Sequence, residues 1–375
     1  MPGLLPDVDP DGLLEYSVVY TDRALNHMSK RFSVAMRDIS ATLKEVYGAA
    51  SAVVVPGSGS FGMEAVARQF AGGKDVLIVR NGWFSYRWTQ IFEMAGVASS
   101  STVLKARMIS PAAKSPFAPA PLDEIVGTIR ASKPAVVFAP HVETSAGLML
   151  PDDYLSAIGA AVHEYGGLFV LDCVASGAMW VDMRATGVDV LISAPQKGWS
   201  STPCAGLVML SEHANAALAS TTSSSFSLDL KKWAAIMQAH EQGAMAYHAT
   251  YPTDGLVQLR DAMNETRAMG LPQAKAAQTE LGQRVRTLME SKGIRSVAAP
   301  GFQAPCVIVS YTDHADWQNT KAFAAQGLQV AAGVPLACDE PADYASFRVG
   351  LFGLDKLQNI ERTVASFETA LNALL

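Results

Sequence analysis

Short runs of aliphatic residues alternate with longer amphipathic stretches through the first two-thirds of the chain. The runs are rich in Val, Ile and Leu and carry almost no charge, which is typical of buried strands, whereas the stretches between them repeat apolar positions at helical spacing. This alternation predicts an α/β fold with a mostly parallel sheet covered by helices on both faces. The seven predicted strands span residues 52–55, 76–79, 102–104, 135–139, 168–171, 188–193 and 206–210.

The helical stretches have recognisable ends. Residues 29–47 place apolar side chains on one face and stop at Gly48, a favoured C-cap residue. A second helix is expected over residues 152–165, and a third covers Met63, Val66 and Phe70. The Ser/Thr-rich segment 220–227 is interpreted as an ordered loop, because a helical run follows it directly.

The pattern changes near residue 271. A long polar helix (273–292), two short strands (307–310 and 346–351) and a terminal amphipathic helix (354–374) follow, which indicates a smaller α+β unit. The predicted organisation is an N-terminal arm (1–28), a large domain (29–265) and a small C-terminal domain (266–375), without internal repeats.

Composition narrows the functional class. The 375 residues are 49% hydrophobic and 17% charged, with a net charge of −6, so the chain is globular and carries no basic surface suited to nucleic acid. The first twelve residues are acidic and broken by prolines, unlike a signal peptide, and no apolar run reaches membrane-spanning length.

Cysteine and histidine spacing indicates neither disulfides nor a metal centre. The four cysteines lie far apart with no CxxC pair, which suits reduced thiols in a cytoplasmic protein. The seven histidines show no HxxxH or His/Cys spacing, so no metal site is expected.

Two charged residues stand out in apolar surroundings. Lys197 is the only charge between Val190 and Ser211, and Asp172 ends the hydrophobic run LFVL. An ammonium confined by apolar neighbours loses its proton readily, which makes Lys197 a candidate Schiff-base nucleophile. The carboxyl ends of parallel strands line the ligand crevice of an α/β sheet, so both side chains would reach one site. Lys197 at an exposed loop tip and Asp172 as a turn residue are the alternatives.

A glycine-rich loop follows the first predicted strand. Gly57-Ser58-Gly59-Ser60 precedes a helix, so its N–H groups and hydroxyls would form a cradle for a phosphate. Together with Gly62 the loop also matches the dinucleotide fingerprint GxGxxG, and Arg80 at the end of the next strand could bind a ribose 2′-phosphate. An NADP-binding oxidoreductase therefore stays open on spacing alone, although it leaves Lys197 and Asp172 unexplained.

From about residue 29 to the C-terminus, the chain resembles the class V, fold-type-I aminotransferases that use pyridoxal phosphate (PLP), within them the alanine–glyoxylate and serine–glyoxylate branch. The motifs that carry the resemblance are GSGSFGMEA, NGWFSYR, HVETSAG, LDCVAS, SAPQKG, YHAT and FRVGLFG, in that order. The resemblance implies a transaminase that moves an amino group from an amino acid to a small 2-oxo acid, with glyoxylate or pyruvate as expected acceptors.

The resemblance also assigns roles to residues. Lys197 matches the lysine that binds PLP covalently, and Asp172 matches the partner of the pyridine nitrogen. Val174 and Phe84 would pack on opposite faces of the ring, and Thr144 would lie near its hydroxyl. The residues that match phosphate ligands are Ser58, Gly59, Ser60 and Gln196.

Three further positions follow from the same resemblance. Tyr247 and Thr250 match residues that reach the phosphate in the neighbouring subunit, which implies a homodimer with shared sites. Arg348 matches the arginine that binds the substrate carboxylate bidentately. The alternatives are a core tyrosine at 247 and a buried ion pair between Arg348 and Asp343.

The chain departs from the family pattern at two places where the donor side chain would be recognised. Leu14-Glu15-Tyr16-Ser17 stands in place of a PGP motif, and Ser60 replaces a histidine. The rival within the fold is a lyase such as a cysteine desulfurase, with Cys338 as a sulfur acceptor. Phe84 and Gln196 stand where desulfurases usually have histidines, which favours the transaminase.

Overall fold

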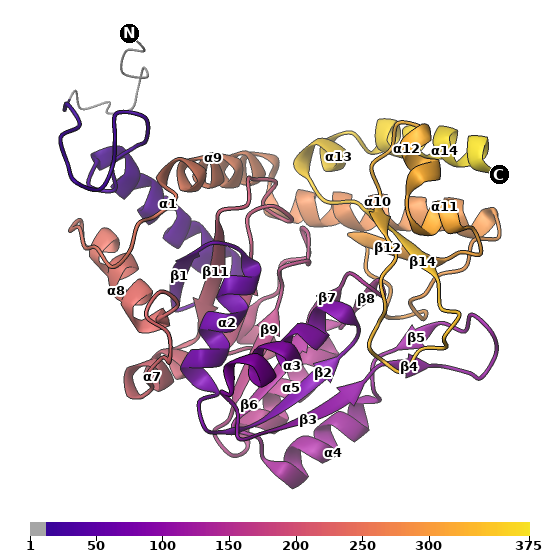
Figure 1. The fold of residues 1–375 in the computed structure, drawn as a ribbon, viewed down its shortest axis with the longest axis horizontal. Helices are drawn as coiled ribbons and strands as arrows, with labels where there is room; N and C mark the ends of the chain where they lie inside the picture. The colour runs from indigo at the N-terminus through magenta and orange to yellow at the C-terminus, as the bar shows by residue number, and fades with distance from the viewer. Residues whose placement is uncertain (1–12) are drawn as a thin grey trace.

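The computed structural model describes residues 13–375, in which a large sheet forms the centre of the molecule (Figure 1). The sheet has seven strands, and all seven predicted strands belong to it. In spatial order they are β1 (Ser51–Pro56), β11 (Ala205–Leu210), β10 (Val190–Ser193), β9 (Leu168–Asp172), β6 (Val136–Pro140), β2 (Asp75–Arg80) and β3 (Ser100–Lys105).

Strand β11 is the one strand of this sheet that runs against the others, since it pairs antiparallel with both β1 and β10, while the remaining pairs are parallel. The expectation of a mostly parallel α/β sheet is therefore confirmed. Every residue of β9, β10 and β11 is buried, as their uninterrupted aliphatic sequences predict.

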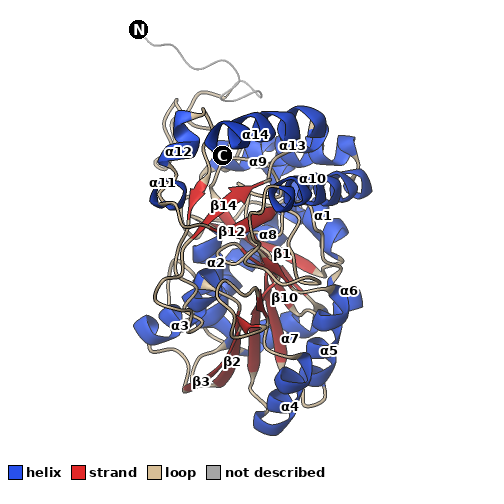
Figure 2. Ribbon diagram, turned by 90° about the vertical axis from the view of Figure 1, so that its right-hand side faces the viewer, coloured by secondary structure: helices blue, strands red, loops and turns tan. Residues whose placement is uncertain are grey.

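Helices lie on both faces of the sheet (Figure 2). Helices α2 and α3 pack against each other and against the strands, and α4 and α5 form a second pair at β9. The helices of this part of the chain are α1 (Lys30–Tyr47), α2 (Gly59–Phe70), α3 (Trp83–Ala95), α4 (Leu122–Ser132), α5 (Asp152–His163), α6 (Met183–Thr186), α7 (Glu212–Ser220), α8 (Leu230–Glu241) and α9 (Thr253–Met269).

The ends of α1 agree with the sequence. The hydroxyl of Ser29 accepts a hydrogen bond from the N–H of Phe32, and Gly48 adopts the left-handed conformation at the other end. Segment 221–229 forms the loop expected before α8. None of the described helices combines the length and hydrophobicity needed to cross a bilayer.

The C-terminal part of the chain builds a three-stranded antiparallel sheet beside a long helix, at the upper right of Figure 1. Helix α9 runs through residue 265, so we propose that the division between the two domains lies at Gly270, where α9 gives way to α10. The elements are α10 (Leu271–Ser291), β12 (Val307–Tyr311), α11 (Ala315–Gln318), α12 (Lys321–Ala325), β13 (Ala331–Ala332), β14 (Ser346–Gly350), α13 (Leu354–Gln358) and α14 (Ile360–Leu374).

The predicted single helix over 354–374 is wrong, because the helix is interrupted at Asn359. The side-chain amide of Asn359 donates to the carbonyl of Asp355, the group that its own backbone N–H would use in a continuous helix.

The structure also contains two short hairpins that were not expected from the sequence. One pairs β4 (Arg107–Met108) with β5 (Phe117–Ala118), and the other pairs β7 (Val142–Glu143) with β8 (Leu148–Met149).

Helix α10 packs closely against the chain that leads into the small sheet. A Cβ atom on Gly282, in the middle of α10, would lie 2.3 Å from the carbonyl oxygen of Pro305, just before β12. Gly127 in α4 has open space around the same position. Gly282 is therefore needed for close packing, whereas Gly127 is not.

We predict opposite effects for two glycine-to-alanine substitutions. Gly282→Ala should lower the free energy of unfolding by about 1–3 kcal/mol through overpacking, although alanine favours helix. Gly127→Ala should raise it by up to about 1 kcal/mol. Urea denaturation of both variants measures these changes, and a stabilised Gly282→Ala variant would contradict the packing described here.

Candidate active site

Asp172 and Lys197 are brought together by two neighbouring parallel strands. Asp172 is the last residue of β9 and lies opposite Ile192 of β10, and Lys197 is in the turn that follows β10. The turn is fixed by a contact that only glycine allows, since a Cβ atom on Gly198 would lie 2.2 Å from the carbonyl oxygen of Gly177. The two side chains therefore share one edge of the sheet.

Asp172 is a buried carboxyl group. Its Oδ1 accepts a hydrogen bond of 2.9 Å from the N–H of Val174, and no ion pair among the described residues includes it. Burial raises the pKa of Asp172 to about 6, and only part of this rise is offset by the Val174 N–H and by the charges of Arg87 and Lys197. A cationic partner over this carboxylate would restore its ordinary pKa. The bond of Asp172 to the N–H two residues ahead is also the bond that a turn residue makes, so the turn role is present as well.

The amine of Lys197 lies in a largely apolar setting. Burial lowers its pKa, and the nearby guanidinium of Arg348 lowers the pKa further. The Nζ atom is 5.0 Å from the centre of the Phe352 ring. Lys197 is thus half-buried rather than exposed at a loop tip, and it loses its proton more readily than a surface lysine.

The glycine loop ends directly at the first turn of α2. Gly57 has a φ of +122°, a conformation that other residues rarely adopt, and Ser58 is the N-cap but makes no side-chain capping bond. A Cβ atom on Gly59 would lie 2.7 Å from the side chain of Val174. Phe61 and Gly62 donate their N–H groups to the carbonyl of Ser58, whereas the N–H groups before them point out of the helix start, where an anion can accept from them.

Arg87, which the sequence did not single out, lies beside this loop. Its Nη1 donates to the hydroxyl of Ser60 at 2.8 Å, and its guanidinium carbon is 5.4 Å from the centre of the Phe84 ring. No ion pair among the described residues includes Arg87. A positive charge without an acidic partner therefore lies at the candidate phosphate cradle.

The start of α3, which carries Phe84, is capped by a buried carboxylate from the hairpin of β7 and β8. Glu143 accepts hydrogen bonds from the N–H groups of Phe84 and Ser85 at 3.2 and 2.8 Å, and so caps the N-terminus of α3. A Cβ atom on Gly82 would collide with Glu143 and Ser145, so glycine is required at this helix end. Glu143 was not predicted as a site residue; its neighbour Thr144 is buried in the same hairpin.

Arg348 approaches the site from the second sheet. It lies on β14, its Nε donates to the carbonyl of Ala332 at 2.8 Å, and its guanidinium carbon is 5.5 Å from the centre of the Phe84 ring. Burial lowers its pKa. The ion pairs of the described residues include none between Arg348 and Asp343, so that alternative is wrong.

Comparison with known proteins agrees with this arrangement. The family model "Aminotransferase class-V" matches residues 13–352. The chain belongs to the class-V aminotransferase family. It is 30% identical to 2-aminoethylphosphonate–pyruvate transaminase 2 of Paraburkholderia xenovorans (strain LB400), over 88% of this chain and 86% of the relative. It is 26% identical to the alanine–glyoxylate aminotransferase of Callithrix jacchus, over 92% and 82%.

The fold agrees as well. A solved alanine–glyoxylate aminotransferase from Nostoc sp. superposes with a TM-score of 0.77 at 22% identity, covering 92% of this chain and 88% of that one. The predicted fold-type-I architecture is confirmed, and the chain is a PLP-dependent aminotransferase.

The site fits PLP on four features of this structure. Asp172 is a buried carboxylate that lacks a cation, and the α2 end with Arg87 lacks an anion. The amine of Lys197 has a lowered pKa, and the contact between Gly59 and Val174 joins the two ends of the site. A ring nitrogen that carries a proton, a phosphate and an aldehyde carbon are the complementary groups.

Three predicted cofactor residues are solvent-exposed in the single chain. Gln196 is exposed in the lysine turn, and Tyr247 is 54% exposed, with its hydroxyl 3.1 Å from that of Thr250. Tyr247 is therefore not a core tyrosine.

In the altered N-terminal motif, Glu15 accepts hydrogen bonds from Ser17 and Asn26 and so stabilises its own turn.

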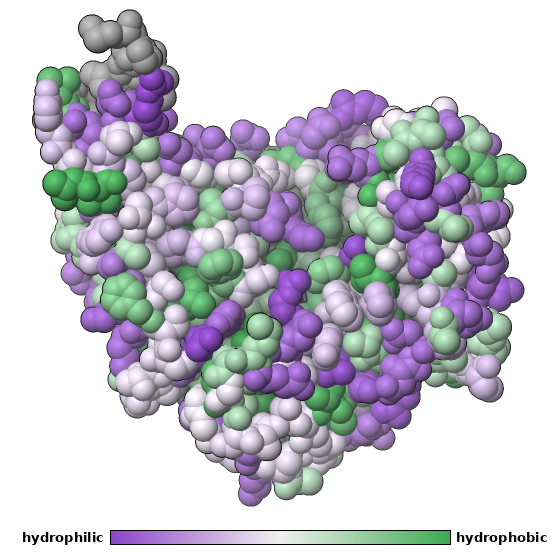
Figure 3. All heavy atoms as spheres, viewed as in Figure 1, coloured by the Kyte–Doolittle hydropathy of each residue, from purple (hydrophilic) through white to green (hydrophobic). Residues whose placement is uncertain are grey.

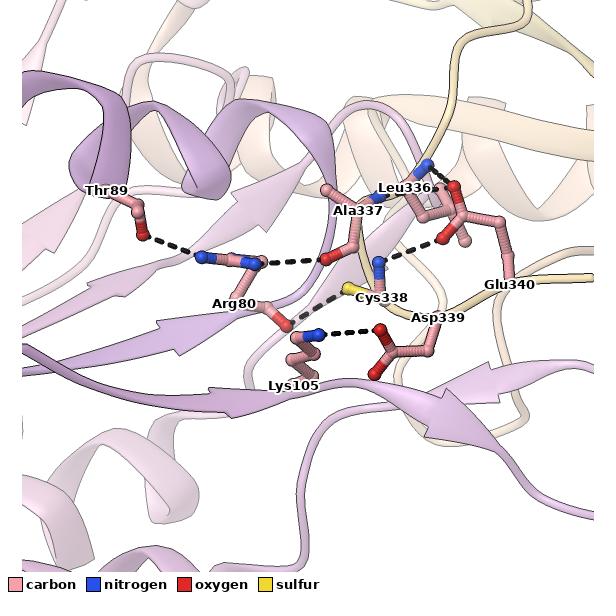
Figure 4. A network of polar contacts seen from close by, with 8 residues as sticks. All are labelled: Arg80, Thr89, Lys105, Leu336, Ala337, Cys338, Asp339 and Glu340. Atoms are coloured by element: carbon pink, nitrogen blue, oxygen red, sulfur yellow. Dashed lines mark hydrogen bonds and ion pairs between the residues drawn. The ribbon is translucent and has the colours of Figure 1, made fainter. Parts of the chain in front are cut away.

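The loop 336–340 connects the small sheet to the edge of the large one (Figure 4). Glu340 accepts hydrogen bonds from the N–H groups of Leu336, Ala337 and Cys338, and Lys105 pairs with Asp339 at 2.6 Å. Burial would raise the pKa of Glu340, but these N–H donors lower it below its usual value. The loop leads into β14 and so helps to position Arg348.

The same loop argues against both rival functions. Arg80 is buried and donates to Thr89 and to the carbonyl of Ala337, so it is not available for a ribose phosphate. Cys338 is buried, its thiol donates to the carbonyl of Arg80, and burial raises its pKa to about 12. Such a thiol is a poor nucleophile.

We predict that Asp172 makes the cofactor-free protein less stable as the pH rises. The folded pKa of about 6 lies above that of an unfolded aspartate, so stability that is present at low pH is lost as the buried carboxyl ionises. Relative to Asp172→Asn, the wild type should lose about 3 kcal/mol of unfolding free energy between roughly pH 4 and pH 7. Urea unfolding of both proteins across this range measures the difference; a difference that does not vary with pH would refute it.

Proposed function

We propose that this aminotransferase takes its amino group from a donor that carries a carboxylate, and passes it to a small 2-oxo acid such as glyoxylate or pyruvate. The observation that carries the proposal is the convergence of Lys197, Asp172 and Arg348 from two sheets on one site. The named acceptors of the relatives, glyoxylate and pyruvate, support the choice of a small 2-oxo acid.

The roles of these residues follow from their chemistry. The bond to Ala332 uses only the Nε of Arg348, so both of its terminal NH2 groups remain available, and together they suit a substrate carboxylate, which needs a planar bidentate donor. Because its pKa is lowered, the amine of Lys197 can take the proton from the donor's Cα and return it later. When bound, PLP supplies an electron sink for the charge left at Cα, and a carboxylate at Asp172 holds its ring nitrogen protonated.

The remaining residues would hold the cofactor in place. Val174 and Phe84 would pack on opposite faces of the ring, and Thr144 would lie near the ring hydroxyl. The loop of α2 would bind the phosphate, and Arg87 would add a positive charge there, opposite in sign to the ligand. The residues proposed for the phosphate are Ser58, Gly59, Ser60, Gln196 and Arg87.

We also propose a homodimer whose two sites share residues. Tyr247 and Thr250 are exposed and bonded to each other, and would bind the phosphate held by the partner subunit. Large hydrophobic side chains are exposed in the same chain, including Val18, Phe226 and Met245. Figure 3 shows hydrophobic groups on the side of the molecule that carries the N-terminal segment.

A cytoplasmic location fits the four unpaired, buried cysteines.

A half-reaction screen tests the proposed chemistry. The PLP form is mixed with a panel of amino acids, and the absorbance of the cofactor is followed together with ammonia. We expect conversion to pyridoxamine phosphate with release of a 2-oxo acid and without ammonia. The Arg348→Ala substitution should slow this conversion by carboxylate-bearing donors far more than it weakens PLP binding. Ammonia formed in proportion to the donor consumed would indicate a lyase instead.

The shared site predicts a link between Tyr247 and the cofactor. Tyr247→Phe should reduce PLP affinity by about 10-fold, because one charge-assisted hydrogen bond to a phosphate is lost. Tyr165→Phe serves as the control, since its hydroxyl bonds to Pro134 within its own chain. Equilibrium PLP titration and analytical ultracentrifugation provide the measurements. A fully active monomer that retains PLP would exclude the shared site.

A further inference from the structure

A second cluster of chemically active side chains lies at the opposite end of β10 from Lys197. It consists of His163, Asp189 and His213, whose ligand atoms all lie within 4.8 Å of one another. His163 is the last residue of α5, Asp189 directly precedes β10, and His213 is in the first turn of α7. The three segments are far apart in sequence, which is why the spacing of the histidines gave no sign of the cluster.

Asp189 is the rigid centre of this cluster. It is buried, and its Oδ2 accepts a hydrogen bond of 2.9 Å from the backbone N–H of Phe169, while its Oδ1 accepts one of 3.0 Å from the hydroxyl of Ser211. Burial would raise the pKa of Asp189, but the contacts with His163, Phe169 and Ser211 lower it below its usual value. The carboxylate is thus ionised and fixed in orientation before any ligand binds.

The two imidazoles each contact one oxygen of this carboxylate and are partly exposed to solvent. The Nε2 atom of His163 lies 2.8 Å from Oδ2, the Nδ1 atom of His213 lies 3.2 Å from Oδ1, and the two ring centres are 5.8 Å apart. The side chains of His163 and His213 are 39% and 43% exposed. Both contacts are hydrogen bonds to the carboxylate, so a cation that enters from solvent would replace the shared protons and use the same three ligand atoms.

We propose that His163, Asp189 and His213 bind a divalent transition-metal cation such as Zn²⁺. Two imidazole nitrogens and one carboxylate oxygen form a ligand set that suits Zn²⁺, Co²⁺ or Ni²⁺ and disfavours Ca²⁺ and Mg²⁺, which prefer oxygen ligands alone. Asp189 and Lys197 lie before and after the four residues of β10, roughly 13 Å of extended strand. The metal therefore takes no part in amino transfer. It joins α5, the start of β10 and α7 at the end of the sheet opposite Lys197.

Metal titration of the PLP-bound enzyme without an amino donor tests this site. ZnCl₂ is followed by calorimetry, and CoCl₂ by its visible absorption, whose intensity distinguishes four-coordinate from six-coordinate cobalt. We expect one Zn²⁺ per chain with a Kd on the order of 1 μM, and a rise in Tm of about 4 °C when Zn²⁺ exceeds Kd about 100-fold. Protons that the site releases when the metal binds should appear as a heat that depends on the buffer.

Three variants make the test specific. His163→Asn and His213→Asn each remove one ligand and should weaken Zn²⁺ binding at least about 10-fold and abolish the rise in Tm, with the PLP spectrum and activity unchanged. His314→Asn is the control, because His314 is an exposed histidine outside the cluster, before α11. Binding that is as strong in both ligand variants as in the wild type would mean an adventitious ion only. A wild-type Kd above about 100 μM would equally overturn the proposal.

Discussion

The parallel pairing of β9 with β10 is the constraint on which the catalytic site depends. This pairing places the last residue of one strand, Asp172, beside the turn that carries Lys197. The close contact between Gly177 and Gly198 then fixes that turn against the loop after β9, with no side chain between the two backbones. Because β11 runs back antiparallel on the other side of β10, the lysine turn is held at both of its ends. Arg348, which we propose binds the donor, reaches the same place from a separate sheet, so the site needs both parts of the chain.

The charges of the site complement a ligand that carries both a cationic and an anionic group. Burial of the Asp172 carboxyl and of the Arg348 guanidinium raises the free energy of the cofactor-free state, because neither group has an ion-pair partner among the described residues. In the proposed arrangement, a protonated ring nitrogen would compensate the charge of Asp172 and the phosphate of the cofactor would compensate that of Arg87, whereas a donor carboxylate would do so for Arg348. Cofactor binding and fold stability are therefore linked in this enzyme.

The sequence predicted the features that depend on local patterns. The seven strands follow from their aliphatic runs, and Lys197 and Asp172 were visible as single charges in apolar surroundings, whereas Arg348 was assigned by the family resemblance. Glu143 and Arg87 were missed because their importance depends on their neighbours in space. Glu143 lies at the start of α3 and accepts from its N–H groups, and Arg87 donates to Ser60 at the phosphate cradle. The break at Asn359 was missed because helical periodicity continues across it. The proximity of His163 to His213 likewise follows from the sheet order and has no trace in spacing.

The central claim is that Lys197 is the residue that binds PLP. Reduction of the PLP-bound enzyme with borohydride, followed by proteolysis and mass spectrometry, identifies the lysine that carries the cofactor. The account predicts a single modified peptide that contains Lys197. A phosphopyridoxyl group on another lysine, with Lys197 unmodified, would contradict it.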